Sequence, residues 1–174
     1  MSAELDRDGL LVLCDYNTYA NQKLLAAASW LDEDQLDHDF KMCRYSVRQT
    51  LQHMLEAEVY FLRLCQGKEF TEVPAPEVGH VADYWGAIHE ETRSFLENQS
   101  DADIRKEVHV QFGEHSFTFP VWQMMAQNFN HSMIHRGELS IFMTELGQPL
   151  PDLDIIVHFV KASGQPWPFE EEGA

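Results

Sequence analysis

The pattern of a long helix runs through residues 120–147, whose sequence is PVWQMMAQNFNHSMIHRGELSIFMTELG. Pro120 suits the first helical position, where its missing N–H would have no helical partner, and Gly147 suits the residue that ends a helix. Four polar side chains recur on this helix at spacings of three, four and three residues: Asn128, His131, His135 and Glu138. These spacings place all four on one face. Because apolar residues precede and follow them on that face, we expect a buried stripe interrupted by polar groups that need a partner.

Two of these residues, His131 and His135, stand one helical turn apart and can reach a single metal ion. The spacing alone is weak, because a chain with 9 histidines often contains such a pair by chance. A metal site built by one helix also needs a ligand from another helix, and His53 is the candidate. The sequence therefore predicts a metal ion held by His53, His131 and His135. The alternative is a set of neutral core histidines without an ion, hydrogen-bonded to one of three neighbours: Asn128, Glu138 or Tyr60.

Three further helical patterns precede the histidine-bearing one, with apolar residues at spacings of three and four. They cover residues 10–31, residues 46–65 and residues from about 80 to about 98. Ser46 is a predicted N-cap with Gln49 as its capping-box partner, and Gly67 is placed to end that helix. The acidic stretch of residues 32–37 is expected to begin a polar connection.

A small hairpin is predicted between the third and fourth helices, because apolar and polar residues alternate on both sides of Gly113-Glu114. A short helix is expected over residues 154–161, and residues 165–174 are expected to form a loose acidic tail. The chain is therefore predicted to be all-α: a four-helix bundle with long crossover connections, a small β-hairpin between the third and fourth helices and a short C-terminal helix. Its 174 residues fit one domain, residues 1–174.

The net charge of the chain limits the classes of partner that it can bind. With 29 acidic and 12 basic residues the formal net charge is −17, which repels nucleic acid and anionic membranes. No apolar run approaches the roughly 20 residues of a membrane-spanning helix, and the acidic, polar start differs from a secretory signal. We therefore expect a cytoplasmic protein with a small-molecule partner, no nucleic acid and no membrane.

The three cysteines, Cys14, Cys43 and Cys65, are widely spaced and odd in number. None of them forms a C-x-x-C pair, which would suggest a zinc knuckle or a redox dithiol. We expect reduced thiols that act as small buried hydrophobic residues.

Several segments resemble the DinB or YfiT-like family of metal-binding four-helix bundles, over nearly the whole chain. The most specific is NHSMIHRGEL at residues 130–139. Two others are YNTYANQKLL at residues 16–25 and SVRQTLQHM at residues 46–54, and LGQPLPDLD at residues 146–154 resembles the family's exit from the last long helix. The resemblance implies a divalent metal held by three histidines, which match His53, His131 and His135. Zinc, nickel and iron(II) all suit histidine nitrogen, and zinc is the default.

The resemblance also implies a reaction. Better-understood relatives look like thiol-dependent transferases and isomerases that use bacillithiol, mycothiol or glutathione. We therefore expect a metal-dependent thiol S-transferase in which a metal-activated thiolate attacks a small electrophilic molecule. Glu138 stands where many relatives have Gln, and it can act as an outer hydrogen-bond acceptor for an imidazole, as a base, or as an extra ligand. Glu138 and Tyr60 are the candidate proton carriers.

Two other functions remain open from the sequence. One is a metal-dependent hydrolase in which water replaces the thiol, and the other is a non-catalytic bundle that binds a ligand or a structural ion. Three apolar residues off the histidine face are candidates for a homodimer contact, or for packing against the hairpin or the first helix: Trp122, Phe129 and Met133.

Overall fold

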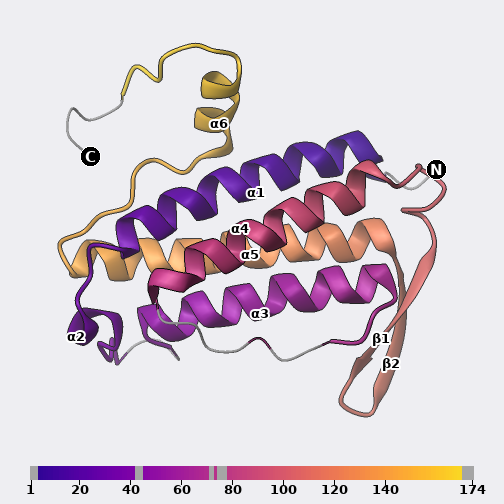
Figure 1. Ribbon diagram of the computed structural model, residues 1–174, viewed down its shortest axis with the longest axis horizontal. Coiled ribbons are helices and arrows are strands. Elements are labelled where there is room, and N and C mark those ends of the chain that lie inside the picture. The colour runs from indigo at the N-terminus through magenta and orange to yellow at the C-terminus, as the bar shows by residue number, and fades with distance from the viewer. Residues whose placement is uncertain (1–3, 42–44, 71–72, 74–77, 170–174) are drawn as a thin grey trace.

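Four long helices form the body of the protein in a computed structural model, which describes residues 4–41, 45–70, 73 and 78–169 (Figure 1). The elements follow one another as α1 (Arg7–Ala28), α2 (Glu33–Leu36), α3 (Val47–Gln66), α4 (Val78–Glu97), β1 (Glu107–Phe112), β2 (His115–Pro120), α5 (Val121–Glu145) and α6 (Ile155–Ala162). The predicted four-helix bundle, the hairpin before its last long helix and the short C-terminal helix are confirmed.

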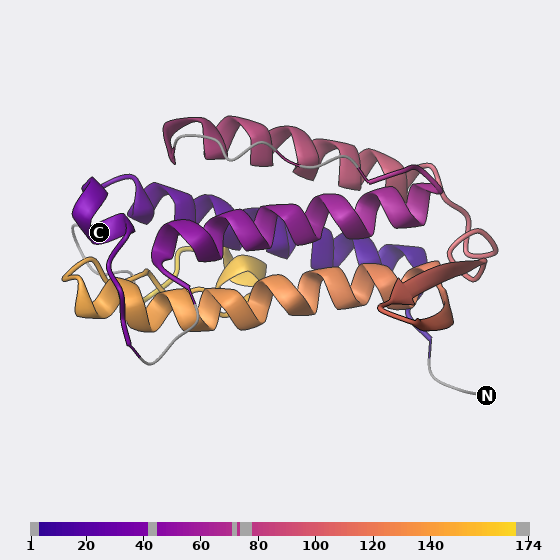
Figure 2. The ribbon, with the colours of Figure 1, turned by 90° about the horizontal axis from the view of Figure 1, so that it is seen from below.

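The long helices pack in a square. α1 contacts α4 and α5, and α3 contacts the same two helices. Figure 2 shows α3 running beside α5, which is the pair that carries the candidate histidines. The hairpin lies at one end of the bundle and α2 at the other, while α6 lies outside the bundle against α1 (Figure 1).

Local signals set the ends of α3 as predicted. The Ser46 side chain accepts a hydrogen bond from the Gln49 N–H, and the Gln49 side chain accepts one from the Ser46 N–H, so the capping box is complete. The helix ends at Gly67, whose φ of 65° is in the left-handed region that favours glycine.

The expected polar connection after α1 contains a short helix that the sequence analysis missed. Asp32 caps α2, and a second capping box joins it to Gln35. A helix of four residues is too short to show an apolar stripe, so the periodicity that predicted the long helices could not predict this one. Its Leu36 is buried in the core.

The start of α5 differs by one residue from the prediction. Pro120 is the N-cap in an extended conformation, and it is also the last residue of β2, paired with Glu107. Two first-turn amides of α5 lack helical partners, and carbonyls of the preceding segment accept from them: Val121 N–H donates to Lys106 O and Trp122 N–H to Ile104 O, each at 2.9 Å. The strand therefore passes directly into the helix.

The apolar core has two parts. The α2-end cluster contains buried residues of α1 to α5 such as Leu24, Leu51 and Leu139. The hairpin-end cluster contains Leu10 and Met125 together with residues of α3, α4 and the hairpin. Between the two clusters the bundle axis is polar, as described below.

The expectation for the cysteines is confirmed at two positions. Cys14 and Cys65 are buried free thiols, and burial raises the pKa of each to about 12. Cys43 lies outside the described residues. At neutral pH both described thiols are protonated and behave as small apolar groups.

The C-terminal part follows the prediction as far as it is described. α6 packs on α1, and the Tyr16 hydroxyl donates to Leu153 O at 2.8 Å. Residues 165–169 form neither helix nor strand, and the remainder of the predicted tail lies outside the described residues. None of the described helices combines the length and the apolar character that crossing a bilayer requires.

Candidate metal centre

Three histidines converge where α3 packs against α5. His53 comes from α3, and His131 and His135 come from α5. Each offers a ring nitrogen, and these three atoms lie within 4.8 Å of one another. The ring centroids are 4.9 Å apart for His53 and His131, 4.8 Å for His53 and His135, and 4.5 Å for His131 and His135. The residues predicted to share a metal ion are therefore neighbours.

The two histidines of α5 face each other through the same ring atom. His131 Nε2 and His135 Nε2 are 3.3 Å apart. Two nitrogens at about 2.0 to 2.1 Å from one tetrahedral ion are about 3.3 Å from each other, so this separation fits a shared zinc-like ion. The donor set of three imidazoles is also chemically suitable, and no carboxylate among the described residues joins the group.

Glu138 contacts the far side of His135. The His135 Nδ1 atom is 2.6 Å from Glu138 Oε2. Since an ionised carboxylate only accepts, we assign the imidazole proton to Nδ1, which leaves the lone pair on Nε2 directed at the cluster. Of the three roles considered for Glu138, this geometry favours the outer hydrogen-bond acceptor.

His131 is held in its neutral form. Burial, together with the neighbouring His135 and His53, lowers the pKa of His131 to about 4. A neutral imidazole is the form that binds a metal, so at neutral pH this residue needs no proton loss to act as a ligand. Its second ring nitrogen, Nδ1, is buried and has no hydrogen-bond partner.

The four polar residues of α5 do not share the buried stripe, contrary to expectation. Asn128 is 1% exposed, but His131 and His135 are half-buried and the Glu138 side chain is 46% exposed. The buried line of α5 continues instead through Ser132 and Arg136. Because α5 is packed between α1 and α3, its core face points between these two helices, and the histidines lie at the α3 edge of that face.

A buried carboxylate that the sequence analysis missed occupies the bundle axis. Glu58 of α3 is 2% exposed and receives hydrogen bonds from all three other long helices. Its donors are Asn17 Nδ2 at 2.9 Å, Asn21 Nδ2 at 2.8 Å, Trp85 Nε1 at 2.7 Å, Ser132 Oγ at 2.8 Å and His89 Nε2 at 3.3 Å. Burial favours a raised pKa, but the hydrogen bonds from His89, Asn17 and Trp85 outweigh it and lower the pKa to about 2.

Arg136 balances this carboxylate through two amides. Its Nη1 donates to Asn17 Oδ1 at 2.6 Å and to Asn21 Oδ1 at 2.7 Å, and each of these asparagines donates to Glu58. Burial lowers the pKa of Arg136, and its guanidinium lies 5.4 Å from the Tyr16 ring centroid. We call Asn17, Asn21, Glu58, Trp85, His89, Ser132 and Arg136 the central polar layer.

His89, which the sequence analysis did not single out, also belongs to the central polar layer. It is 6% exposed and contacts Glu58. A signal for the layer existed in the sequence, because Glu58 stands between Leu55 and Leu62 on the apolar stripe of α3, and Asn17 stands between apolar positions of α1. Partner assignment among these residues still required the packed helices.

The second candidate proton carrier, Tyr60, lies away from the cluster. It is seven residues from His53 in α3, which corresponds to about 10 Å along the helix axis. Its ring contacts those of Phe61 and Phe70, at centroid distances of 5.3 and 5.9 Å. Its role stays a prediction.

Two of the three residues considered for a homodimer contact pack inside the chain. Phe129 is buried in the hairpin-end cluster, and Trp122 is half-buried against it. Met133 is exposed, together with Ile134 and Ile141 of the same helix.

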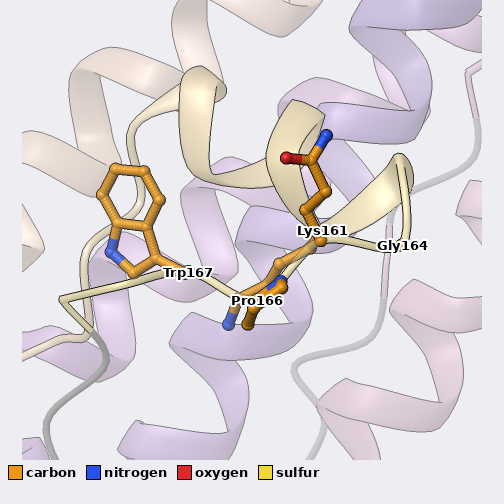
Figure 3. A pocket seen from close by; sticks show the side chains of 5 residues that line it. Lys161, Gly164, Pro166 and Trp167 are labelled. Carbon is orange, nitrogen blue, oxygen red and sulfur yellow. The ribbon is translucent and has the colours of Figure 1, made fainter.

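A surface hollow of about 460 Å³ lies on the C-terminal segment, apart from the histidines. It is lined by Lys161, Gly164, Gln165, Pro166 and Trp167 (Figure 3). None of the candidate site residues lines it, so this hollow is not the entrance to the candidate metal centre.

The chain is similar to known proteins in sequence and in fold. The model of the DinB family matches residues 1–165. A DinB-like protein from Bacillus cereus has a crystal structure that matches with a TM-score of 0.68 at 20% identity, covering 83% of this chain and 95% of that one. A DinB-like protein from Bacillus subtilis matches with a TM-score of 0.60 at 15% identity, covering 82% and 96%. At these identities the two structures show the fold alone. No curated protein matches the chain.

Proposed function

The chain belongs to the DinB family, and on that premise we propose that it holds a divalent metal ion with His53, His131 and His135 and uses it to join a low-molecular-weight thiol to a small electrophilic molecule. The supporting observation is the convergence of three imidazole nitrogens from two helices within 4.8 Å. Zinc, nickel and iron(II) accept such donors, and zinc is the default among them. The net charge of −17 is consistent with a small-molecule substrate rather than nucleic acid.

A divalent ion held by the three histidines would lower the pKa of a thiol or a water molecule and make it nucleophilic near neutral pH. The residues of the chain orient the metal ligands and carry the proton. Glu138 orients His135, and its partly exposed carboxylate can exchange protons with solvent. In the proposed reaction the thiol loses its proton, a sulfur–carbon bond forms, and the proton reaches the opened epoxide oxygen or the leaving group, with Glu138 as a candidate carrier through solvent. Tyr60 is the second candidate proton carrier.

A hydrolase is the alternative enzyme for the same three histidines. Product analysis with and without an added thiol separates the two, because a hydrolase gives the hydroxylated product in both cases. A non-catalytic ligand-binding bundle gives no product in either case and is supported if metal binds without turnover.

The metal site is tested by elemental analysis of protein purified without a polyhistidine tag. We expect about one divalent ion per chain in the unaltered protein, and loss of most of it in His53→Ala, His131→Ala and His135→Ala. His115→Ala is the matched control, since His115 is exposed on β2. Equal metal in all five proteins contradicts the site.

The transferase reaction is tested by thiol consumption with a panel of epoxides and haloaromatic compounds. We expect consumption that depends on added metal and is lost in the three histidine variants. Metal-independent consumption, or none with glutathione, bacillithiol or mycothiol, contradicts thiol transfer while leaving the metal site standing.

Homodimer formation and a cytoplasmic location stay proposals. α5 exposes Met133, Ile134 and Ile141 on a helix with few charged residues, which gives a strongly acidic chain an uncharged surface for self-association. Sedimentation of the protein at micromolar concentration tests the dimer.

A further inference from the structure

Few buried polar atoms among the described residues lack a hydrogen-bond partner, and two of them are one turn apart on α5. They are Asn128 Oδ1 and His131 Nδ1. Residues three apart on a helix have their Cβ atoms about 5 to 6 Å from each other, so the two side chains are neighbours. One atom is an acceptor and the other can carry a proton, which makes them complementary.

The arrangement of His131 determines which of its nitrogens needs that acceptor. Its Nε2 faces His135 Nε2 at 3.3 Å, so Nε2 is the atom available to an ion and Nδ1 is the other ring nitrogen. A histidine that binds a metal through one nitrogen carries its proton on the other and donates it to an acceptor. His135 already has such an acceptor in Glu138 at 2.6 Å, whereas His131 makes no such bond.

Asn128 lowers the stability of the fold at its core position. It is 1% exposed among apolar neighbours such as Met125 and Phe129, and an unpartnered buried amide oxygen is unfavourable for folding. Packing gives no reason for an amide at this position, because an apolar side chain of similar volume, such as Leu, would avoid that cost. The amide oxygen acquires a partner if His131 is fixed with its proton on Nδ1.

We propose that Asn128 is the positioning residue of His131: its Oδ1 accepts the Nδ1 proton when the ring binds a metal, as Glu138 does for His135. The inference rests on the proposed metal site. It makes the two histidines of α5 unequal, since one is held by an exposed carboxylate and the other by a buried neutral amide.

The test uses Asn128→Leu, which removes the acceptor, and Asn128→Asp, which keeps one. Met125→Leu is the matched control, because Met125 is fully buried one turn away and this exchange conserves volume. For each protein we measure the affinity for Zn²⁺ by chelator competition, the visible spectrum of the Co²⁺ form, and the melting temperature of the metal-free form.

In Asn128→Leu we expect a 10- to 100-fold weaker Zn²⁺ affinity and an altered Co²⁺ spectrum, in line with other changes to groups that orient metal ligands. We also expect the metal-free melting temperature to rise by about 2 to 4 °C, because an unpartnered buried amide is gone. A merely structural role would move stability and affinity together or leave affinity unchanged. Asn128→Asp should retain most of the affinity, and Met125→Leu all of it.

Two results overturn the inference while leaving the metal site standing. One is wild-type affinity in Asn128→Leu, and the other is an equal loss in Asn128→Asp and Asn128→Leu. Unaltered protein that takes up neither Zn²⁺ nor Co²⁺ overturns the metal site and the inference together.

Discussion

The histidine cluster and the central polar layer are adjacent in the chain and differ in what lies at the centre of each, three imidazole nitrogens in the cluster and one hydrogen-bonded carboxylate in the layer. His131 is followed by Ser132, and His135 by Arg136, so each histidine precedes a member of the layer. One residue along a helix is a rotation of about 100°, which turns the second side chain of each pair into the bundle axis. The Glu58 carboxylate has five donors there, whereas the nitrogens at the cluster face one another.

The difference teaches which group of polar residues stabilises the fold and which remains available for chemistry. In the layer, donors from three helices satisfy one buried carboxylate, and the bridging asparagines link it to Arg136. Such a network leaves no atom of Glu58 free for a ligand. At the cluster, three nitrogens without a carboxylate converge in a half-buried position, which is what a metal ligand set requires.

The largest effect is expected on stability, when the buried carboxylate of the central polar layer is removed. Glu58→Ala removes the acceptor of five donors and leaves Arg136 buried without its counter-charge, so we expect a loss of about 3 to 5 kcal/mol in the free energy of unfolding. For a chain of this size, that corresponds to a fall of roughly 10 °C in melting temperature. Circular dichroism of the metal-free protein measures it.

The control for this variant is Glu56→Ala. Glu56 is on the same helix, and its carboxylate accepts from Gln52 within that helix. We expect a change of less than about 1 kcal/mol. If both variants melt at the same temperature, the layer does not have the structural role assigned to it.

The second prediction concerns stability at low pH. We expect the free energy of unfolding to fall in two successive pH ranges, first through His131 of the cluster and then through Glu58 of the layer. The folded pKa of His131 is about 4, below its ordinary 6.5, so between these values the unfolded chain binds more protons and stability falls as the pH falls. We expect a loss of about 2 kcal/mol, less than the full shift because solvent screens a ring that is only partly buried. Glu58, with a pKa of about 2, adds a further loss below about pH 4.5.

Urea unfolding of chelator-treated protein at about pH 7 and about pH 4.5 measures the first loss. In His131→Gln that part of the pH dependence should be reduced, because no imidazole remains to take up the proton at this position. An unchanged difference between the two pH values in this variant contradicts the assignment to His131.

The smallest expected effect lies at the edge of the cluster. Glu138→Gln keeps an acceptor oxygen beside His135 but removes its charge, so we expect about tenfold weaker Zn²⁺ affinity with little change in stability. Glu145→Gln, at an exposed position of the same helix, is the control. Loss of stability without loss of affinity in Glu138→Gln would place Glu138 with the structural residues instead.

Sequence patterns predicted much of this molecule because the relevant physics is local. The capping box at Ser46, the left-handed stop at Gly67 and the alternation of the hairpin each depend on residues a few positions apart. The i, i+4 spacing of His131 and His135 likewise follows from helix geometry. These features could be predicted before any tertiary contact was known.

Two features could be known only from the packed bundle: which face of each helix is buried, and which residues of different helices become partners. The apolar pattern of α5 is compatible with a buried line through either His131 or Ser132, and contacts with α1 and α3 select Ser132. Glu58, His89 and Arg136 each resemble a surface residue in sequence, and they form one buried network around the Glu58 carboxylate only when four helices enclose them. Local spacing depends on neighbours along the chain, whereas burial and pairing depend on residues more than 25 positions away, and that is why only the first could be derived from the amino-acid order.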